Sequence, residues 1–114
     1  MSEDIRAHAR NIPLSAQKVR LVVDLVRGKD AMEALSVLKF VPNRASHPVS
    51  KVIASAMANA EENFGISRDD LYIHQIYADV ARTRRWRRFG ARGRFKPILR
   101  RSSHITVVLR EREY

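Results

Sequence analysis

The spacing of apolar and polar residues predicts one strand and then one helix at the start of the chain. Over residues 5–10, apolar side chains alternate with Arg or His, which is the period of a strand with a buried face and a basic outer face. Ser15 is a favourable helix-capping residue, and valines then recur at helical spacing as far as Val26. Gly28 can adopt the left-handed conformation with which helices commonly end.

Two further helices are predicted in the middle of the chain. Asp30 and Glu33 have the spacing of a capping box, in which two side chains satisfy free backbone N–H groups at a helix start. A longer helix is expected to begin near Ser46 or His47 and to end at Gly65. Its many alanines would let other elements approach closely, so we expect it to be the central packing helix.

Two segments in the second half of the chain are predicted to be strands. Residues 71–79 are rich in Tyr and Ile, although their alternation is imperfect. Farther on, Ile105, Val107 and Leu109 alternate with residues that face the other way. The predicted fold class is α+β: a three-stranded antiparallel sheet packed with three helices, plus a long extended β-hairpin arm. We expect residues 1–114 to form a single domain.

The distribution of charge adds a functional element to this fold, because the excess is confined to one stretch. The 114 residues carry 22 Lys or Arg and 12 Asp or Glu, for a formal charge of +10. Residues 1–79 hold ten of each sign, whereas residues 80–110 hold eleven basic residues and no acidic one. Charge concentrated in this way is typical of an element that binds a polyanion. We therefore assign residues 80–102 to a protruding basic β-hairpin arm.

The arm has the residue types that bind RNA. Residues 82–101 read RTRRWRRFGARGRFKPILRR, with Gly90 and Gly93 available for a tight hairpin tip. Arginine outnumbers lysine nine to one, and guanidinium groups both fork onto phosphates and stack on bases, which favours nucleic acid over a membrane. The arm residues predicted to contact RNA are Arg82, Arg84, Arg85, Trp86, Arg87, Arg88, Arg92, Arg94, Lys96, Arg100 and Arg101.

Basic residues outside the arm are predicted to add to this surface. A basic helix face is usually only solvated, so we expect the arm to carry most of the binding. The first helix and the outer face of the first strand nevertheless present cations that could reach phosphates. These residues are Lys18, Arg20, Arg27, Lys29, Arg6 and Arg10.

The sequence offers no site for catalysis, for a cofactor or for a metal. There is no cysteine, and the four histidines are scattered without paired spacing. Ser103 and His104 are neighbours on a predicted strand and so point to opposite faces, which does not suit a Ser–His pair. No apolar run is long enough for a membrane span, and no targeting segment is visible near the first residues.

Three stretches of the sequence resemble bacterial large-subunit ribosomal protein twenty-two, and the resemblance extends over almost the whole chain. They are residues 15–29 (SAQKVRLVVDLVRGK), 55–61 (SAMANAE) and 101–108 (RSSHITVV). The resemblance implies a structural constituent of the large ribosomal subunit that binds large-subunit rRNA and supports subunit assembly. It also implies that the hairpin tip lines the polypeptide exit tunnel and that no reaction is catalysed.

The resemblance further implies partners and a location. The partners would be large-subunit rRNA, neighbouring ribosomal proteins and the nascent polypeptide at the tunnel wall, in ribosomes of the cytoplasm or of an organelle. The chain departs from the family pattern at Val80, Ala81 and Arg82, where relatives commonly have an acidic residue, Gly and Pro. The direction in which the hairpin leaves the sheet is therefore not carried over. The tip residues would be Arg88, Phe89, Gly90, Ala91, Arg92 and Gly93.

Three alternatives stay open on the sequence alone. A DNA-binding architectural protein can also insert basic arms, in that case into the minor groove of DNA. An enzyme acting on RNA would need an acid–base constellation, which the sequence does not supply. An arginine-rich run can also be a disordered tail, although here predicted strands bracket it.

Overall fold

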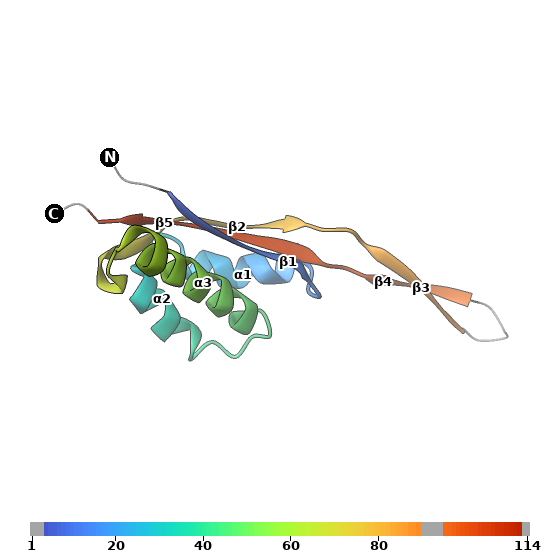
Figure 1. Ribbon diagram of the computed structural model, residues 1–114. Helices are drawn as coiled ribbons and strands as arrows, with labels where there is room; N and C mark the ends of the chain where they lie inside the picture. Colours follow the sequence, from blue (N-terminus) through green and yellow to red (C-terminus); the bar gives the residue numbers. More distant parts are fainter. Residues whose placement is uncertain (1–3, 90–94, 113–114) are drawn as a thin grey trace.

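The computed structural model describes residues 4–89 and 95–112, and for residues 85–89 and 95–98 the backbone alone. Within these residues the chain is α+β: helices cover one face of a three-stranded antiparallel sheet, and a two-stranded ribbon projects from its end (Figure 1). The predicted fold class is therefore confirmed. The elements in chain order are β1 (Ile5–Ile12), α1 (Ala16–Val26), α2 (Ala31–Leu38), α3 (Ser46–Phe64), the 3-10 turn η1 (Arg68–Asp70), β2 (Leu71–Val80), β3 (Arg84–Phe89), β4 (Phe95–Arg100) and β5 (Ser103–Glu111).

The sheet has the order β1–β5–β2, so the strand that follows the arm lies in the centre. Leu109 of β5 is opposite Ile5 of β1 and Ile73 of β2, and all three side chains are buried in the core. The register of β2 shifts between Ile73 and Gln75. This bulge inserts an extra residue and so changes the phase of the side-chain alternation. It explains why the alternation over residues 71–79 is imperfect in the sequence.

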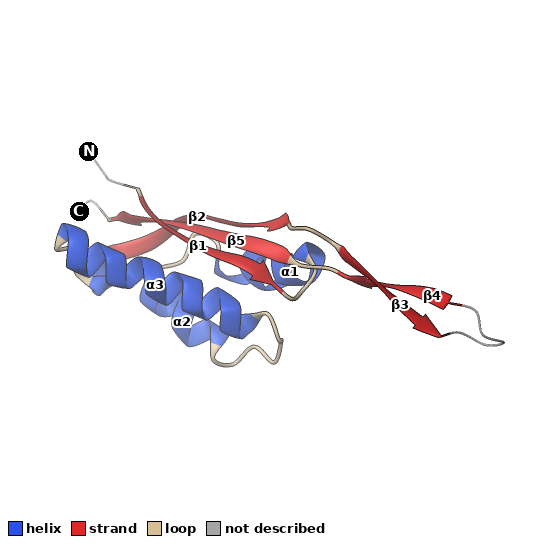
Figure 2. Ribbon diagram, turned by 45° about the vertical axis from the view of Figure 1, so that its right-hand side comes forward, coloured by secondary structure: helices blue, strands red, loops and turns tan. Residues whose placement is uncertain are grey.

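The helices lie together on one side of the sheet (Figure 2). α3 packs against β1, β5 and α2, and its residues Ile53, Ala56 and Ala60 are fully buried. The small alanine side chains let the neighbouring elements approach closely, as predicted for the central packing helix. α1 packs mainly against β2, beside the end of the sheet from which the arm departs.

The start of α1 and the end of α3 follow the sequence prediction. The hydroxyl oxygen of Ser15 accepts a hydrogen bond from the backbone N–H of Lys18 at 3.4 Å. Gly28 and Gly65 have φ angles of 81° and 64°. Glycine adopts this left-handed region without the steric cost that a Cβ atom brings, so both residues allow the chain to turn directly after a helix.

The capping box predicted at Asp30 and Glu33 is wrong. α2 does begin after Asp30, but the Asp30 carboxylate makes no hydrogen bond to the helix start. It accepts instead from Nε of Arg112 at 2.5 Å, while Glu33 forms an ion pair with Lys29 at 3.6 Å. A hydrogen bond between two charged groups is stronger than one to a neutral backbone N–H. The Asp30 carboxylate therefore binds Arg112, although this residue is far away in the sequence.

β3 and β4 form the predicted hairpin arm as far as the structure describes it. They are antiparallel and in register from Arg84 opposite Arg100 to Phe89 opposite Phe95. The molecule measures 67 Å along its longest axis, against 26 and 18 Å in the other directions. The ribbon is visibly twisted (Figure 2), as two-stranded ribbons usually are. Residues 90–94, which include most of the predicted tip, lie outside the described residues.

Candidate nucleic-acid interface

The arm leaves the sheet with little break in backbone pairing. The N–H of Ala81 donates to the carbonyl of Ser102 at 3.0 Å, and the Ser102 hydroxyl donates to the carbonyl of Arg82 at 2.9 Å. β2 leads into β3 and β4 leads into β5, so the arm extends two strands of the sheet (Figure 1). Side chains at the base of the arm therefore have a rigid support.

Four arginines surround this junction, and we call them the arm-root cluster: Arg82, Arg84, Arg100 and Arg101. All four are exposed, and Arg84 lies directly opposite Arg100 in the ladder. Across residues 4–89 and 95–112, no ion pair within 4.0 Å involves any of them. Like charges on opposite strands repel each other, so a bound polyanion would stabilise this arrangement.

Two open hollows flank the arm-root cluster. One, of about 510 Å³, lies between the cluster and the end of β1, where Asn11 and Pro13 line it. The other, of about 500 Å³, lies between the arm and the start of α1, where Ser15, Gln17 and Thr83 line it. The first turn of α1 holds no acidic residue, and the partial positive charge of a helix start favours anions nearby. The second hollow is therefore suited to a phosphate group, and so is the first because all four arginines of the cluster line it.

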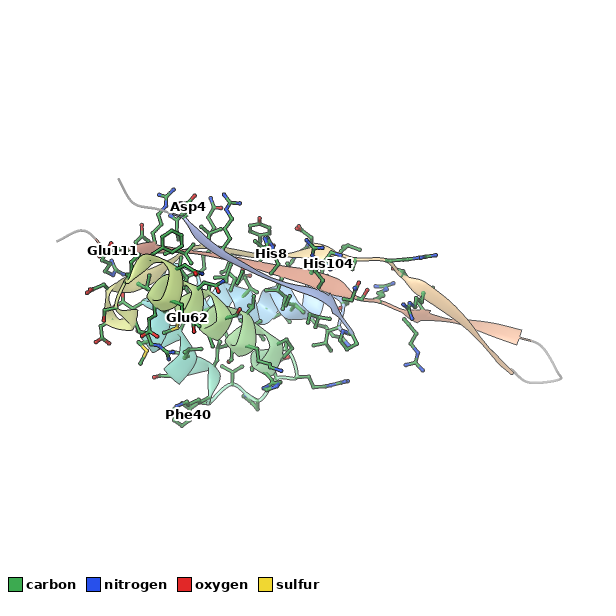
Figure 3. The ribbon with its side chains drawn as sticks, viewed as in Figure 1. Asp4, His8, Phe40, Glu62, His104 and Glu111 are labelled. Atoms are coloured by element: carbon green, nitrogen blue, oxygen red, sulfur yellow. The ribbon has the colours of Figure 1, made fainter. Side chains whose placement is uncertain are left out.

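Acidic side chains gather at the other end of the domain. Asp4, Glu62 and Glu111 lie away from the arm (Figure 3). Nε of Arg110 donates to the Asp4 carboxylate at 2.6 Å, and this hydrogen bond lowers the pKa of Asp4 and raises the pKa of Arg110. Arg110 is one of the eleven basic residues of residues 80–110, and the Asp4 carboxylate neutralises its charge within the domain. The net positive charge therefore belongs to the arm and its root.

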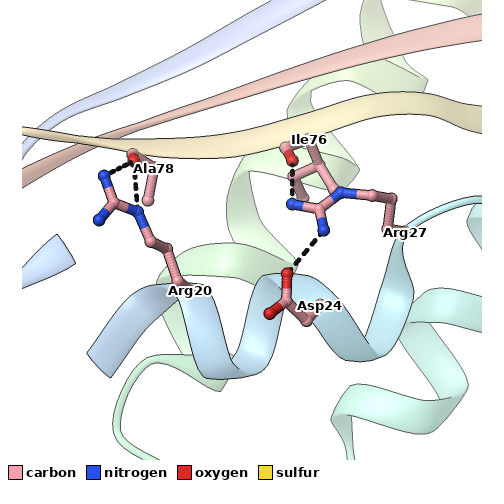
Figure 4. A network of polar contacts seen from close by, with 5 residues as sticks. All are labelled: Arg20, Asp24, Arg27, Ile76 and Ala78. Carbon is pink, nitrogen blue, oxygen red and sulfur yellow. Dashed lines mark hydrogen bonds and ion pairs between the residues drawn. The ribbon is translucent and has the colours of Figure 1, made fainter. Parts of the chain in front are cut away.

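Arg20 of α1 and Arg27, the residue that follows this helix, reach the outer edge of β2 (Figure 4). Nε and Nη2 of Arg20 donate to the carbonyl of Ala78 at 3.1 and 2.9 Å. Nη2 of Arg27 donates to the carbonyl of Ile76 at 3.0 Å, and its Nη1 donates to Asp24 at 2.6 Å. β2 is an edge strand, so among the described residues no strand pairs with Ile76 or Ala78 on this side. The two arginines fasten α1 to the sheet, and their RNA contacts stay predictions.

The other predicted contacts differ in their surroundings. Lys29 is paired with an acidic side chain of α2, and Arg6 lies 3.7 Å from Asp4. Lys18 and Arg10 are exposed, and in the described part of the chain neither takes part in an ion pair within 4.0 Å. Arm side chains from residue 85 to residue 98 lie outside what the structure describes. Their contacts therefore stay predictions as well.

Two histidines of the sheet, His8 and His104, have structural partners. Nδ1 of His8 lies 3.1 Å from the hydroxyl of Thr106, and the N–H of Asn11 donates to Nδ1 of His104 at 3.0 Å (Figure 3). Asn11 has a φ of 57° at a register shift of β1, where His104 accepts a hydrogen bond from its backbone N–H.

The described residues contain no group of three potential metal ligands. None of the described helices is long and apolar enough to cross a membrane.

A small α+β domain that projects a basic ribbon, with unpaired arginines where the ribbon begins, has the features of a protein that binds folded RNA. Comparison with known families makes the assignment specific. The family described as "Ribosomal protein L22p/L17e" matches residues 7–110, and the chain belongs to this family. The resemblance found in the sequence is confirmed, and the family is a structural class without enzymatic activity.

Relatives from several bacteria bear the name "Large ribosomal subunit protein uL22". The protein of Dehalococcoides mccartyi strain BAV1 is 54% identical over 106 residues, which cover 93% of this chain and 97% of that protein. The Thermoanaerobacter sp. strain X514 protein is 47% identical over 110 residues, covering 96% and 99%. The Cutibacterium acnes protein is 51% identical over 107 residues, covering 94% and 70%.

Proposed function

We propose that this chain is a structural constituent of the large ribosomal subunit in the bacterial cytoplasm, where it binds large-subunit rRNA and supports subunit assembly. The observation that carries the proposal is the arm-root cluster. Its four guanidinium groups have no ion-pair partner within 4.0 Å in the described residues, and the sheet supports their backbone. Guanidinium groups form paired hydrogen bonds to phosphate oxygens. Neighbouring ribosomal proteins are expected as further partners.

The paired backbone of the arm supports entry into folded RNA. A disordered basic tail must lose conformational entropy when it binds, at roughly 1–2 kcal/mol for each backbone residue fixed. β3 and β4 are already paired from Arg84 to Phe89, so much of that cost is met when the protein folds. A ribbon also presents side chains on both faces, so RNA on either side of it can be contacted.

We also propose that the tip, residues 88–93, lines the polypeptide exit tunnel and touches the nascent polypeptide. Family membership supports this, as does the direction of β3 and β4 away from the domain (Figure 1). The test is a photoreactive amino acid in place of Ala91, in ribosomes that carry a stalled nascent chain. A cross-link to the nascent chain is expected, and cross-links to rRNA alone would exclude the contact.

The main test is the salt dependence of affinity for large-subunit rRNA. Arg84→Gln combined with Arg100→Gln removes two charges from the arm root. Lys39→Gln combined with Lys51→Gln removes two exposed charges from α2–α3 and serves as the control. Because each phosphate contact contributes about 0.7 to 0.9 to the slope of log affinity against log salt, the arm-root variant should lose roughly 1.5 from the slope. Equal losses in both variants would contradict the arm-root assignment.

A parallel titration with duplex DNA separates this function from that of a DNA-binding architectural protein. The intact chain should prefer large-subunit rRNA over duplex DNA at equal salt, because folded rRNA offers grooves, junctions and unpaired bases to the arm. Deletion of residues 82–100 should abolish the preference while circular dichroism still reports a folded domain. Equal affinity of the intact chain for both nucleic acids would refute the rRNA assignment.

A further inference from the structure

A third hollow beside the arm combines exposed leucines with basic residues. It has a volume of about 640 Å³ and lies between the exposed face of α1, the base of the arm and the chain before α3. Leu14, Leu21 and Leu99 contribute to it, and we call it the Leu21 groove. Leu21 is 64% exposed and Leu99 is 47% exposed. Such exposure leaves apolar surface in contact with water, and a ligand could cover it.

The rim of the Leu21 groove is cationic. Lys18 comes from α1, Arg44 from the chain before α3, and Arg100 and Arg101 from the base of the arm. No Asp or Glu contributes to the lining, and across the described residues none of these four cations takes part in an ion pair within 4.0 Å. Three separate parts of the chain therefore place basic residues around the same leucines.

This combination of surfaces matches one nucleotide. A nucleobase has flat apolar faces and the phosphates on either side of it are anionic, whereas bases inside a duplex are stacked and cannot reach a side chain. The volume of the groove falls within the range of roughly 300–1,000 Å³ that is usual for small-ligand sites. Arg100 and Arg101 belong both to this groove and to the arm-root cluster. An RNA strand held by the cluster can therefore continue into the groove.

We propose that the Leu21 groove binds one unpaired nucleotide of large-subunit rRNA. The base covers Leu21 and Leu99, while Lys18 and Arg44 neutralise the adjoining phosphates. The proposal rests on the rRNA-binding function and adds to it a subsite that selects an unpaired nucleotide next to the RNA that the arm enters. Arg44 is an exposed basic residue outside the arm, and the sequence alone does not mark it as a binding residue. The proposal makes Arg44 part of the binding surface.

The first experiment compares Leu21→Ser with Leu25→Ser. Leu25 lies one turn farther along α1, is 47% exposed and lines none of the three hollows, so it is a matched control. Leu21→Ser should weaken rRNA affinity about five- to tenfold through lost apolar contact, without changing the salt slope because no charge is removed. Arg44→Gln should lower the slope by about 0.7 to 0.9. Equal rRNA affinities of the two leucine variants would overturn the proposal.

The second experiment identifies what occupies the groove. A benzophenone amino acid replaces Leu21, and the full-length protein is cross-linked within assembled large subunits. The expected product joins residue 21 to one rRNA nucleotide that reacts with base-specific chemical probes in free rRNA and is protected in the complex. A cross-link to a paired segment or to a neighbouring protein would overturn the proposal. Arg82→Gln combined with Arg84→Gln removes two arm-root charges that do not line the groove, so the salt slope of this variant tests the general rRNA function separately.

Discussion

Replacement of Arg20 by methionine should destabilise the domain through its effect on the edge of β2. Methionine keeps the apolar stem and removes the guanidinium group, which donates to the Ala78 carbonyl at 3.1 and 2.9 Å. Ala78 is only 3% exposed, so water has little access to replace these bonds. A buried carbonyl left without a partner costs about 1–3 kcal/mol. Because Arg20 itself is exposed, we expect a loss of about 1–2 kcal/mol.

Urea unfolding followed by circular dichroism measures this loss. Lys18→Met removes one positive charge from the same helix at a position without an ion-pair partner among the described residues, and surface changes of this kind usually stay within roughly 0.5 kcal/mol. The midpoint should fall for Arg20→Met with an unchanged m-value. If the two variants are equally stable, the hydrogen bonds to Ala78 contribute nothing and the reasoning is refuted.

The same two variants test whether Arg20 also binds rRNA. Loss of a phosphate contact lowers the salt slope by about 0.7 to 0.9, whereas loss of a purely internal contact leaves it unchanged. Lys18→Met should lower the slope. An unchanged slope for Arg20→Met would show that Arg20 stabilises the fold without binding rRNA. A decrease equal to that of Lys18→Met would show that Arg20 does both.

Three further predictions concern stability. Ser15→Ala removes the side-chain cap of α1 and should cost about 0.5–1 kcal/mol in urea unfolding. Gly65→Ala places a Cβ at a φ of 64°, where it meets no other atom within 4 Å, so it should cost about 1 kcal/mol through backbone strain alone. The hydrogen bond from Arg110 lowers the pKa of Asp4 in the folded state, so its contribution to stability is present above the unfolded pKa and is lost as pH falls through the folded pKa. Asp4→Asn should therefore flatten the pH dependence of the urea midpoint below about pH 4, and an unchanged profile would contradict this.

Much of the fold could be predicted because its signals are local. The helix starting after Ser15 and the strand at residues 105–109 depend on spacing within a few residues, and both are confirmed. The capping box failed for a different reason. Asp30 meets Arg112, which is 82 residues away in the chain, and no local pattern predicts that contact.

The candidate site likewise has features that the sequence predicts and features that depend on the folded structure. The arm was predicted because its charge lies in one continuous stretch, and the opposed positions of Arg84 and Arg100 follow once two strands are paired. The contacts of Arg20 depend on which strand forms the sheet edge, and sequence spacing does not contain that information. The Leu21 groove likewise depends on Arg44, which only the packing of α3 brings near the arm.

The central position of β5 has a consequence for how the protein is made. Within residues 4–89 and 95–112, β1 and β2 do not pair with each other and each forms its ladder with β5, so the sheet needs residues 103–111 before it can form. During synthesis the whole basic arm emerges before this closing strand. β1 must then find a partner about 100 residues away, and such distant pairings slow folding. A newly made chain therefore exposes its arginines to RNA while the domain that positions them is still open.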